Sequence, residues 1–153
     1  MPVPYEGGCI CGAIRYRLEA EPLALSCCHC TDCQRHSGTA FVLSMPVFKE
    51  AVKLLKGSPA NYEVHLESGH VRHGAHCGNC ATRLWGQPPR FEQVLVLRSG
   101  TLDDPGRFEP VAHIWVRSKQ PWVVIPEGVA SFETQPEDPF AIVKLWREKH
   151  ARA

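Results

Sequence analysis

Cys77-Gly78-Asn79-Cys80 and Cys9-Ile10-Cys11 are two tight cysteine pairs that lie far apart in the chain. Thiolates held one or two residues apart share a small volume, which suits a soft, tetrahedral cation such as Zn²⁺. Neither pair completes a tetrahedron alone. We therefore predict that the two pairs together hold one structural zinc ion, which staples the start of the chain to its middle.

A third cluster, Cys28-His29-Cys30-Thr31-Asp32-Cys33, packs three thiols into six residues. If Cys28, Cys30 and Cys33 bind one ion, its fourth position is open to water, a substrate thiol or another side chain. A zinc ion there would hold an incoming thiol as a thiolate and polarise a carbonyl group. This cluster therefore predicts catalysis, and the chemistry it favours is making or breaking a carbon–sulfur bond.

Two side chains just after the triplet are candidates for binding substrate. Arg35 can grip a carboxylate through two hydrogen bonds. His36 can complete the tetrahedron or move a proton near neutral pH, and a surface histidine at a helix end is the competing interpretation. His29 lies between two candidate ligands, so we expect its side chain to point away from the metal, in an orienting or exposed place. His113 stays unassigned.

The eighth cysteine, Cys27, is expected to be a small buried hydrophobic residue, with a redox or nucleophilic role as the alternative. Eight cysteines could also form a disulfide framework. We favour metal binding, because the chain is longer than small disulfide scaffolds and because Cys9 and Cys11 cannot easily bridge each other. Four histidines are expected to alternate on a wet strand face rather than to bind a third metal: His65, His70, His73 and His76.

Composition narrows the class of protein. The chain has 153 residues, of which 44% are hydrophobic and 22% charged, and we predict one domain over residues 1–153. A formal net charge of +1 gives no basic excess for nucleic acid. The apolar runs are too short to span a membrane, and the N-terminus has no secretory signal. We expect a cytoplasmic protein, where thiols stay reduced; the oligomeric state is left open.

Alternation of apolar and polar residues predicts a mainly β fold. The predicted strands are 13–18, 23–28, 40–48, 52–55, 61–66, 71–76, 93–98 and 112–116. A short helical turn is expected over 32–36, ended by Gly38. An amphipathic helix is expected near the C-terminus over 139–150, with Asp138 as its N-cap. Three tryptophans are expected in the core or in a pocket wall: Trp85, Trp115 and Trp122.

The ordered set of three cysteine clusters resembles the family of glutathione-dependent formaldehyde-activating enzymes, whose fold is a zinc-containing β-tent of short antiparallel strands. The likeness begins at Gly7-Gly8-Cys9-Ile10-Cys11-Gly12 and covers most of the chain. The later stretches that carry it are Ser37-Gly38-Thr39-Ala40-Phe41, Gly100-Thr101-Leu102-Asp103-Asp104, His113-Ile114 and Pro121-Trp122. Two positions depart from the family pattern: Ala81 stands where glycine is usual, and His76 where an aromatic residue is usual.

The resemblance implies two zinc ions per chain, with the occupancy of the second left open. It implies a structural zinc on Cys9, Cys11, Cys77 and Cys80. It also implies a second zinc, at the active site, on Cys28, Cys30 and Cys33. The implied reaction joins formaldehyde to the small thiol glutathione, and is classed as a carbon–sulfur lyase in reverse. The alternatives are a non-catalytic zinc-binding module and a thiol redox protein.

Overall fold

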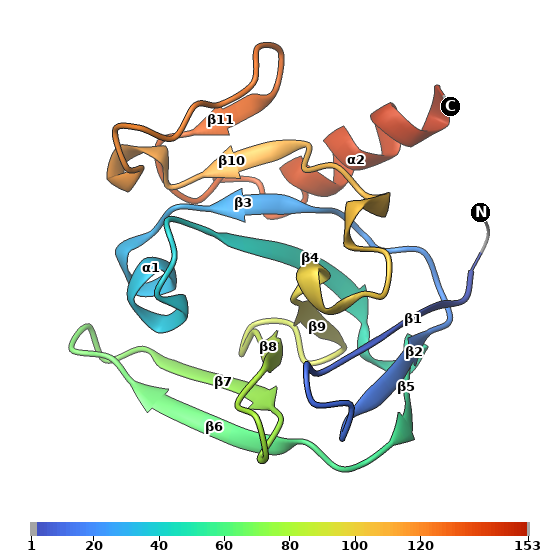
Figure 1. The fold of residues 1–153 in the computed structure, drawn as a ribbon. Helices are drawn as coiled ribbons and strands as arrows, with labels where there is room; N and C mark the ends of the chain where they lie inside the picture. Colours follow the sequence, from blue (N-terminus) through green and yellow to red (C-terminus); the bar gives the residue numbers. More distant parts are fainter. Residues whose placement is uncertain (1–2, 153) are drawn as a thin grey trace. The chain divides into compact units, whose positions relative to one another are not determined.

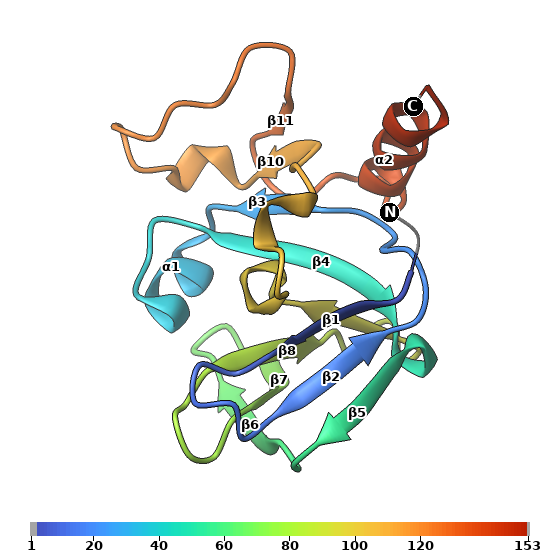
Figure 2. The same ribbon diagram turned by 45° about the vertical axis from the view of Figure 1, so that its right-hand side comes forward.

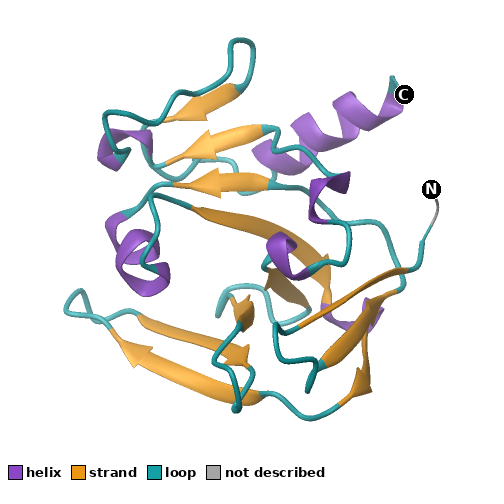
Figure 3. Cartoon of the chain, viewed as in Figure 1, coloured by secondary structure: helices purple, strands orange, loops and turns teal. Residues whose placement is uncertain are grey.

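Strands dominate the computed structural model, which describes residues 3–152 (Figure 3). The described residues form two compact units: unit 1 holds 3–22 and 45–107, and unit 2 holds 23–44 and 108–152. Each unit contains one of the predicted cysteine sites, so each is described by itself. The prediction of one domain over the whole chain stays a prediction.

Unit 1 contains a three-stranded antiparallel sheet in the order β1 (Tyr5–Gly8), β2 (Arg15–Leu18) and β5 (Val52–Lys56) (Figure 2). Arg15 of β2 makes two hydrogen bonds with the Asp103 carboxylate, of 2.7 and 2.5 Å. This pair holds the pKa of Asp103 below its usual value. The pairing therefore ties the sheet to the segment that follows the 3-10 helix η2 (Ser99–Thr101).

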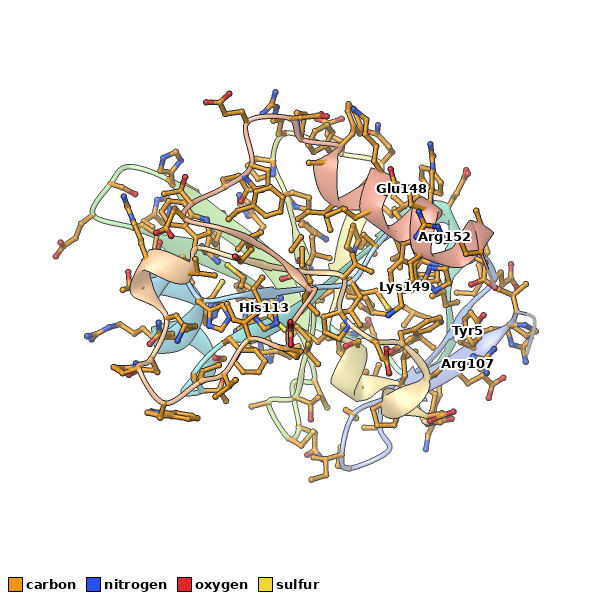
Figure 4. The ribbon with its side chains drawn as sticks, turned by 90° about the horizontal axis from the view of Figure 1, so that it is seen from above. Tyr5, Arg107, His113, Glu148, Lys149 and Arg152 are labelled. Atoms are coloured by element: carbon orange, nitrogen blue, oxygen red, sulfur yellow. The ribbon has the colours of Figure 1, made fainter. Side chains whose placement is uncertain are left out.

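The other strands of unit 1 pair antiparallel in the order β4, β9, β8, β7 and β6. Their bounds are β4 (Val42–Phe48), β6 (Ala60–His65), β7 (Val71–His76), β8 (Arg83–Gln87) and β9 (Val94–Leu97). Two more 3-10 helices are η1 (Lys49–Ala51) and η3 (Pro105–Arg107). The Arg107 guanidinium lies over the Tyr5 ring, 5.5 Å from its centroid (Figure 4). Fully buried side chains of this unit include Tyr16, Leu18, Met45, Leu84 and Leu97.

Unit 2 is built on the strand order β11 (Ala130–Phe132), β10 (Ala112–Ile114), β3 (Ser26–Cys28) and the first half of β4 (Figure 1). β3 and β4 are antiparallel, whereas β10 runs parallel to both β3 and β11. The helix α1 (Thr31–Ser37) joins β3 to β4, and the 3-10 helix η4 (Val116–Ser118) follows β10. The sequence patterns predict strands, but not this local departure from the antiparallel arrangement.

The two predicted helices are present. α1 ends at Gly38, which adopts the left-handed conformation (φ 70°) and donates its amide to the Gln34 carbonyl, as predicted. The second helix is α2 (Ala141–Ala151), and its N-cap is Phe140 rather than Asp138. The Asp138 carboxylate still accepts a hydrogen bond from the Phe140 amide at 2.9 Å. The prediction of Asp138 as N-cap was wrong because the chain makes one further turn before the helix begins.

All of the predicted strands appear, β7 with the predicted bounds and the others with shifted ends, but β1, β8 and β11 were missed. These three strands are short, and β1 contains two glycines. Pairing with a partner strand, rather than a local pattern, selects them, as Gly7 with Tyr16 illustrates. Within the described residues, neither helix has the length and apolar character that crossing a membrane requires.

A glycine before the first cysteine pair offers a test of this arrangement. A Cβ atom on Gly8 would collide with the Ile14 carbonyl, so we expect Gly8→Ala to destabilise the protein by about 1–3 kcal/mol. Gly100→Ala is the control, because no atom lies within 4 Å of its added Cβ. Urea unfolding measures both. Equal stability of the two variants would contradict the close approach of β1 and β2.

Candidate metal centres and active site

The first cysteine cluster lies in unit 1, in two turns. Cys9 follows β1, and its main chain closes a tight turn through hydrogen bonds with Gly12 (3.1 Å) and Ile14 (3.1 Å). Cys77 follows β7, and the Ala81 amide donates to its carbonyl at 2.9 Å. Each turn is therefore held by hydrogen bonds of its own, and each turn carries one pair of cysteines.

The four sulfur atoms of this cluster have the separations that a tetrahedral zinc ion imposes. All four Sγ atoms lie within 4.8 Å of one another. The Sγ atoms of Cys9 and Cys11 are 3.5 Å apart, and those of Cys11 and Cys77 are 3.8 Å apart. Zn–S bonds of about 2.3 Å at tetrahedral angles place sulfurs about 3.8 Å apart. The cluster, completed by Cys80, therefore fits a closed metal site.

Hydrogen bonds favour ionisation of Cys9 and Cys80; at Cys77 backbone hydrogen bonds act in the same direction, but burial and the sulfurs of Cys9 and Cys80 raise its pKa. The Ile14 amide lies 3.2 Å from the Cys9 sulfur, and the Asn79 side chain 3.3 Å from the Cys11 sulfur. Hydrogen bonds from the Thr82 hydroxyl and amide lower the pKa of Cys80 to about 5. Burial opposes ionisation of Cys9, yet the Ile14 hydrogen bond and the neighbouring sulfurs bring its pKa below the usual value. Thiolates are the form that binds metal.

The departure at Ala81 has a structural consequence. Ala81 adopts φ 65°, in the left-handed region that glycine occupies without strain. Its amide closes the Cys77 turn, so the unfavourable conformation is compensated by the turn it completes. His76, the second departure, donates a hydrogen bond from Nδ1 to the Cys77 carbonyl at 3.0 Å.

The second cluster lies in unit 2, where β3 passes into α1. Cys28 ends β3, Cys30 is the N-cap of α1, and Cys33 lies on the buried side of that helix. The Cys30 sulfur accepts a hydrogen bond from the Cys33 amide at 3.2 Å. The sulfurs of Cys33 and Cys28 are 3.5 Å apart, and all three lie within 4.8 Å of one another. These three thiols could hold a metal ion.

Apolar packing surrounds this second cluster on its inner side. Cys28 and Cys33 are buried, while Cys30 is only partly buried. The apolar residues packed with the cluster are Val42, Ile114, Trp115, Phe132 and Ile142. Contacts with the sulfurs of Cys30 and Cys33, together with burial, raise the pKa of Cys28 above its usual value. Without a cation Cys28 therefore favours the neutral thiol.

Within residues 3–152, no fourth histidine, cysteine or carboxylate ligand atom joins this triplet. His36, which could have completed the tetrahedron, lies half-buried in the last turn of α1 and outside the cluster. Among the described residues the cluster therefore offers three ligand atoms, and an open fourth position stays a prediction.

A shallow depression lies on the side of α1 that carries Arg35. Its volume is about 390 Å³, and its lining residues are Thr31, Gln34, Arg35 and Thr39. Thr31, one of these lining residues, directly follows the partly buried Cys30 in the chain. Arg35 is exposed there. Substrate binding by Arg35 and His36 stays a prediction.

Behind the cluster, His29 is fully buried rather than exposed. Its Nε2 atom lies 2.8 Å from Nδ1 of His113, and burial lowers the pKa of both histidines. Gln34 donates to the His29 carbonyl at 2.8 Å and to the Ser118 carbonyl at 2.9 Å. Sequence reasoning missed the pairing of His29 with His113 and the role of Gln34, because no local pattern signals contacts between residues so distant in the chain.

The structure also gives the burial and the contacts of the remaining residues singled out from the sequence. Cys27 is buried, and burial raises its pKa to about 11, as expected for a hydrophobic thiol. None of the eight cysteines is in a disulfide. Trp85 is buried and Trp115 packs against the triplet, but Trp122 is 72% exposed and does not belong to the core. The histidine-rich hairpin alternates in exposure along β6, and no metal group of three ligands forms there among the described residues.

Comparison with known proteins shows which family has these three cysteine clusters. The model of the family described as "Glutathione-dependent formaldehyde-activating enzyme" matches residues 4–118, which include all three cysteine clusters. The chain belongs to this family. The family's name supports a function that involves glutathione and formaldehyde.

Two individual proteins are also similar. A Halomonas elongata protein that carries the provisional name of a glutathione-dependent formaldehyde-activating enzyme is 27% identical over 157 residues, covering 96% of this chain and 94% of its own. A crystal structure of a Rhodobacter sphaeroides protein matches with a TM-score of 0.52 and 15% identity, covering 83% of this chain and 98% of its own. The latter likeness concerns the fold alone.

The first cluster allows a direct test of metal dependence. Cys77→Ser should lose its ion and unfold unit 1, because zinc sites of this type contribute on the order of 10 kcal/mol to folding. Cys27→Ala is the matched control; it should keep the metal and lose about 1 kcal/mol. Metal analysis measures the zinc content of both variants, and circular dichroism measures whether they are folded. A Cys77→Ser protein as stable as the control would mean that the first cluster does not hold the fold.

Proposed function

We propose that this protein is a zinc-dependent carbon–sulfur lyase that acts on a thiol–carbonyl adduct, such as that of glutathione with formaldehyde. The observation that carries the proposal is a three-thiol cluster that no fourth histidine, cysteine or carboxylate of the described residues joins; its Cys30 is only partly buried and precedes α1, where Arg35 lines a depression. The family name supports glutathione and formaldehyde as the chemical class of substrate.

Two zinc ions per chain are part of the proposal. Cys9, Cys11, Cys77 and Cys80 would hold a structural ion with a complete set of sulfurs. Cys28, Cys30 and Cys33 would hold the second ion at the active site. When bound there, zinc supplies Lewis acidity, which lowers the pKa of a substrate thiol and polarises a carbonyl oxygen.

The chain's own residues provide binding and orientation. In the synthetic direction, the thiol sulfur of glutathione forms a bond to the formaldehyde carbon, and the thiol proton ends on the former carbonyl oxygen. Glutathione carries two carboxylates, and Arg35 can bind one of them with paired hydrogen bonds. His36, at the end of the same helix, is proposed as a second substrate contact. The reverse reaction breaks the same bond and returns the proton to sulfur.

The proposal places the protein in a reducing compartment, the cytoplasm, because all eight cysteines are thiols and seven of them lie in metal-ligand clusters. It also treats residues 1–153 as one functional domain. A metal-binding module and a redox protein are the competing functions that the experiment below separates from the lyase.

The catalytic cluster is tested by Cys30→Ser. We expect the parent protein to contain about two zinc ions and the variant about one, with the fold intact and turnover lost. Turnover is measured by exchange NMR with ¹³C-formaldehyde and glutathione; Cys27→Ala, which should remain active, is the control. Equal turnover of Cys30→Ser and its parent would refute the lyase. A parent protein with two zinc ions but no turnover would favour the binding module. Disulfide bonds that form among the three cysteines after peroxide treatment would favour the redox protein.

Arg35 is tested through the dependence on glutathione concentration. Arg35→Ala should raise the KM for glutathione roughly tenfold, which corresponds to about 1.4 kcal/mol, and leave kcat little changed. Arg35→Lys should retain part of the affinity, since it keeps the charge but not the planar fork. Arg90→Ala is the control, an exposed arginine of unit 1. If Arg35→Ala and Arg90→Ala behave alike, Arg35 does not bind substrate.

A further inference from the structure

The buried imidazole pair behind the triplet is the feature that the proposed reaction leaves unused. His29 is 0% exposed and His113, labelled in Figure 4, is 6% exposed. Their rings are stacked with centroids 5.1 Å apart, and the Phe41 ring lies 5.1 Å from that of His29. One hydrogen bond of 2.8 Å joins Nε2 of His29 to Nδ1 of His113. Two polar rings are thus buried together and joined by a single hydrogen bond.

The other nitrogen of His29 decides where the proton of this hydrogen bond lies. Nδ1 of His29 is buried, and no described residue forms a hydrogen bond with it. A buried N–H without an acceptor is rarer in proteins than a buried acceptor without a donor. The proton of His29 therefore belongs on Nε2, which donates to Nδ1 of His113. His113 then carries its own proton on Nε2, so both rings have a defined tautomer.

The main chain of His29 is held as firmly as its ring. Its amide donates to the Ile114 carbonyl at 3.0 Å, and its carbonyl accepts from the Gln34 side chain at 2.8 Å. The Gln34 oxygen in turn accepts from the Gln120 side chain at 2.6 Å. His29 stands directly between Cys28 and Cys30. Any rotation or shift of this residue would move two of the three sulfurs.

We propose that His113 is a positioning residue that fixes His29 in one tautomer and one orientation, and so holds the thiols of Cys28 and Cys30 at the spacing a shared metal ion needs. The inference rests on the proposed metal centre. His113 acts through the segment between the ligands and not on the metal, since it does not belong to the cluster of ligand atoms. Outer hydrogen bonds of this kind commonly change metal affinity by 10–100-fold.

Two variants of nearly equal size separate hydrogen bonding from space filling. The Asn side chain in His113→Asn presents an oxygen near the place of Nδ1, whereas His113→Leu presents only carbon. In reducing buffer with a competing chelator, we expect His113→Leu to lose second-site zinc affinity about 10–100-fold and His113→Asn less than about threefold. First-site zinc should be unchanged in both. Equal losses in the two variants, or none in His113→Leu, would overturn the inference.

The parent protein gives a second measurement, in case His113→Leu fails to fold. Long-range ¹H–¹⁵N NMR of its histidine rings should show one tautomer of His29, protonated at Nε2. An averaged mixture of tautomers, or a proton on Nδ1, would overturn the positioning role. A parent that binds one zinc at excess zinc would remove the proposed metal centre and this inference with it; a parent with two zinc ions and an averaged His29 removes the inference alone.

Discussion

The closeness of sulfur atoms is the constraint on which this structure depends. Thiols from two distant segments in unit 1, and from one six-residue stretch in unit 2, lie within 4.8 Å of one another and form no disulfide. Thiolates at that distance repel each other, so a cation is the simplest agent that reconciles their charge with their spacing. In unit 1 the cluster joins the turn after β1 to the turn between β7 and β8. In unit 2 it joins the end of β3 to α1.

The two clusters differ in how far the protein itself stabilises thiolates. Around the first, the Ile14 amide, the Asn79 side chain and Thr82 all contact sulfur, and the pKa of Cys80 falls to about 5. Around the second, the surroundings are largely apolar and the pKa of Cys28 rises. The first cluster therefore favours the thiolates of Cys9 and Cys80, although the pKa of Cys77 is raised, whereas the surroundings of the second favour the neutral thiol of Cys28.

The sequence determines some of these features locally and others only through folding. The cysteine clusters and the turn ended by Gly38 were predictable, because spacing and glycine conformation act over a few residues. The short strand β11 was not, since a parallel neighbour defines it. The pairing of His29 with His113 joins residues 84 positions apart, so only the register of β10 beside β3 brings them together. The left-handed Ala81 was signalled by the glycine usual at that place, although the residue itself disfavours that conformation.

Trp115 shows how the second cluster and its supports are linked. Trp115 adopts φ 59°, an unfavourable conformation that costs a bulky residue about 1–3 kcal/mol. Its ring packs against the triplet and carries the Arg117 guanidinium at 5.0 Å, and this burial offsets the strain. The turn it forces ends β10 and starts η4, whose Ser118 carbonyl accepts from Gln34. The same turn therefore places the apolar Trp115 side chain against the thiols and the Ser118 carbonyl within hydrogen-bond reach of α1. These two contacts explain why the strained conformation is kept at this position.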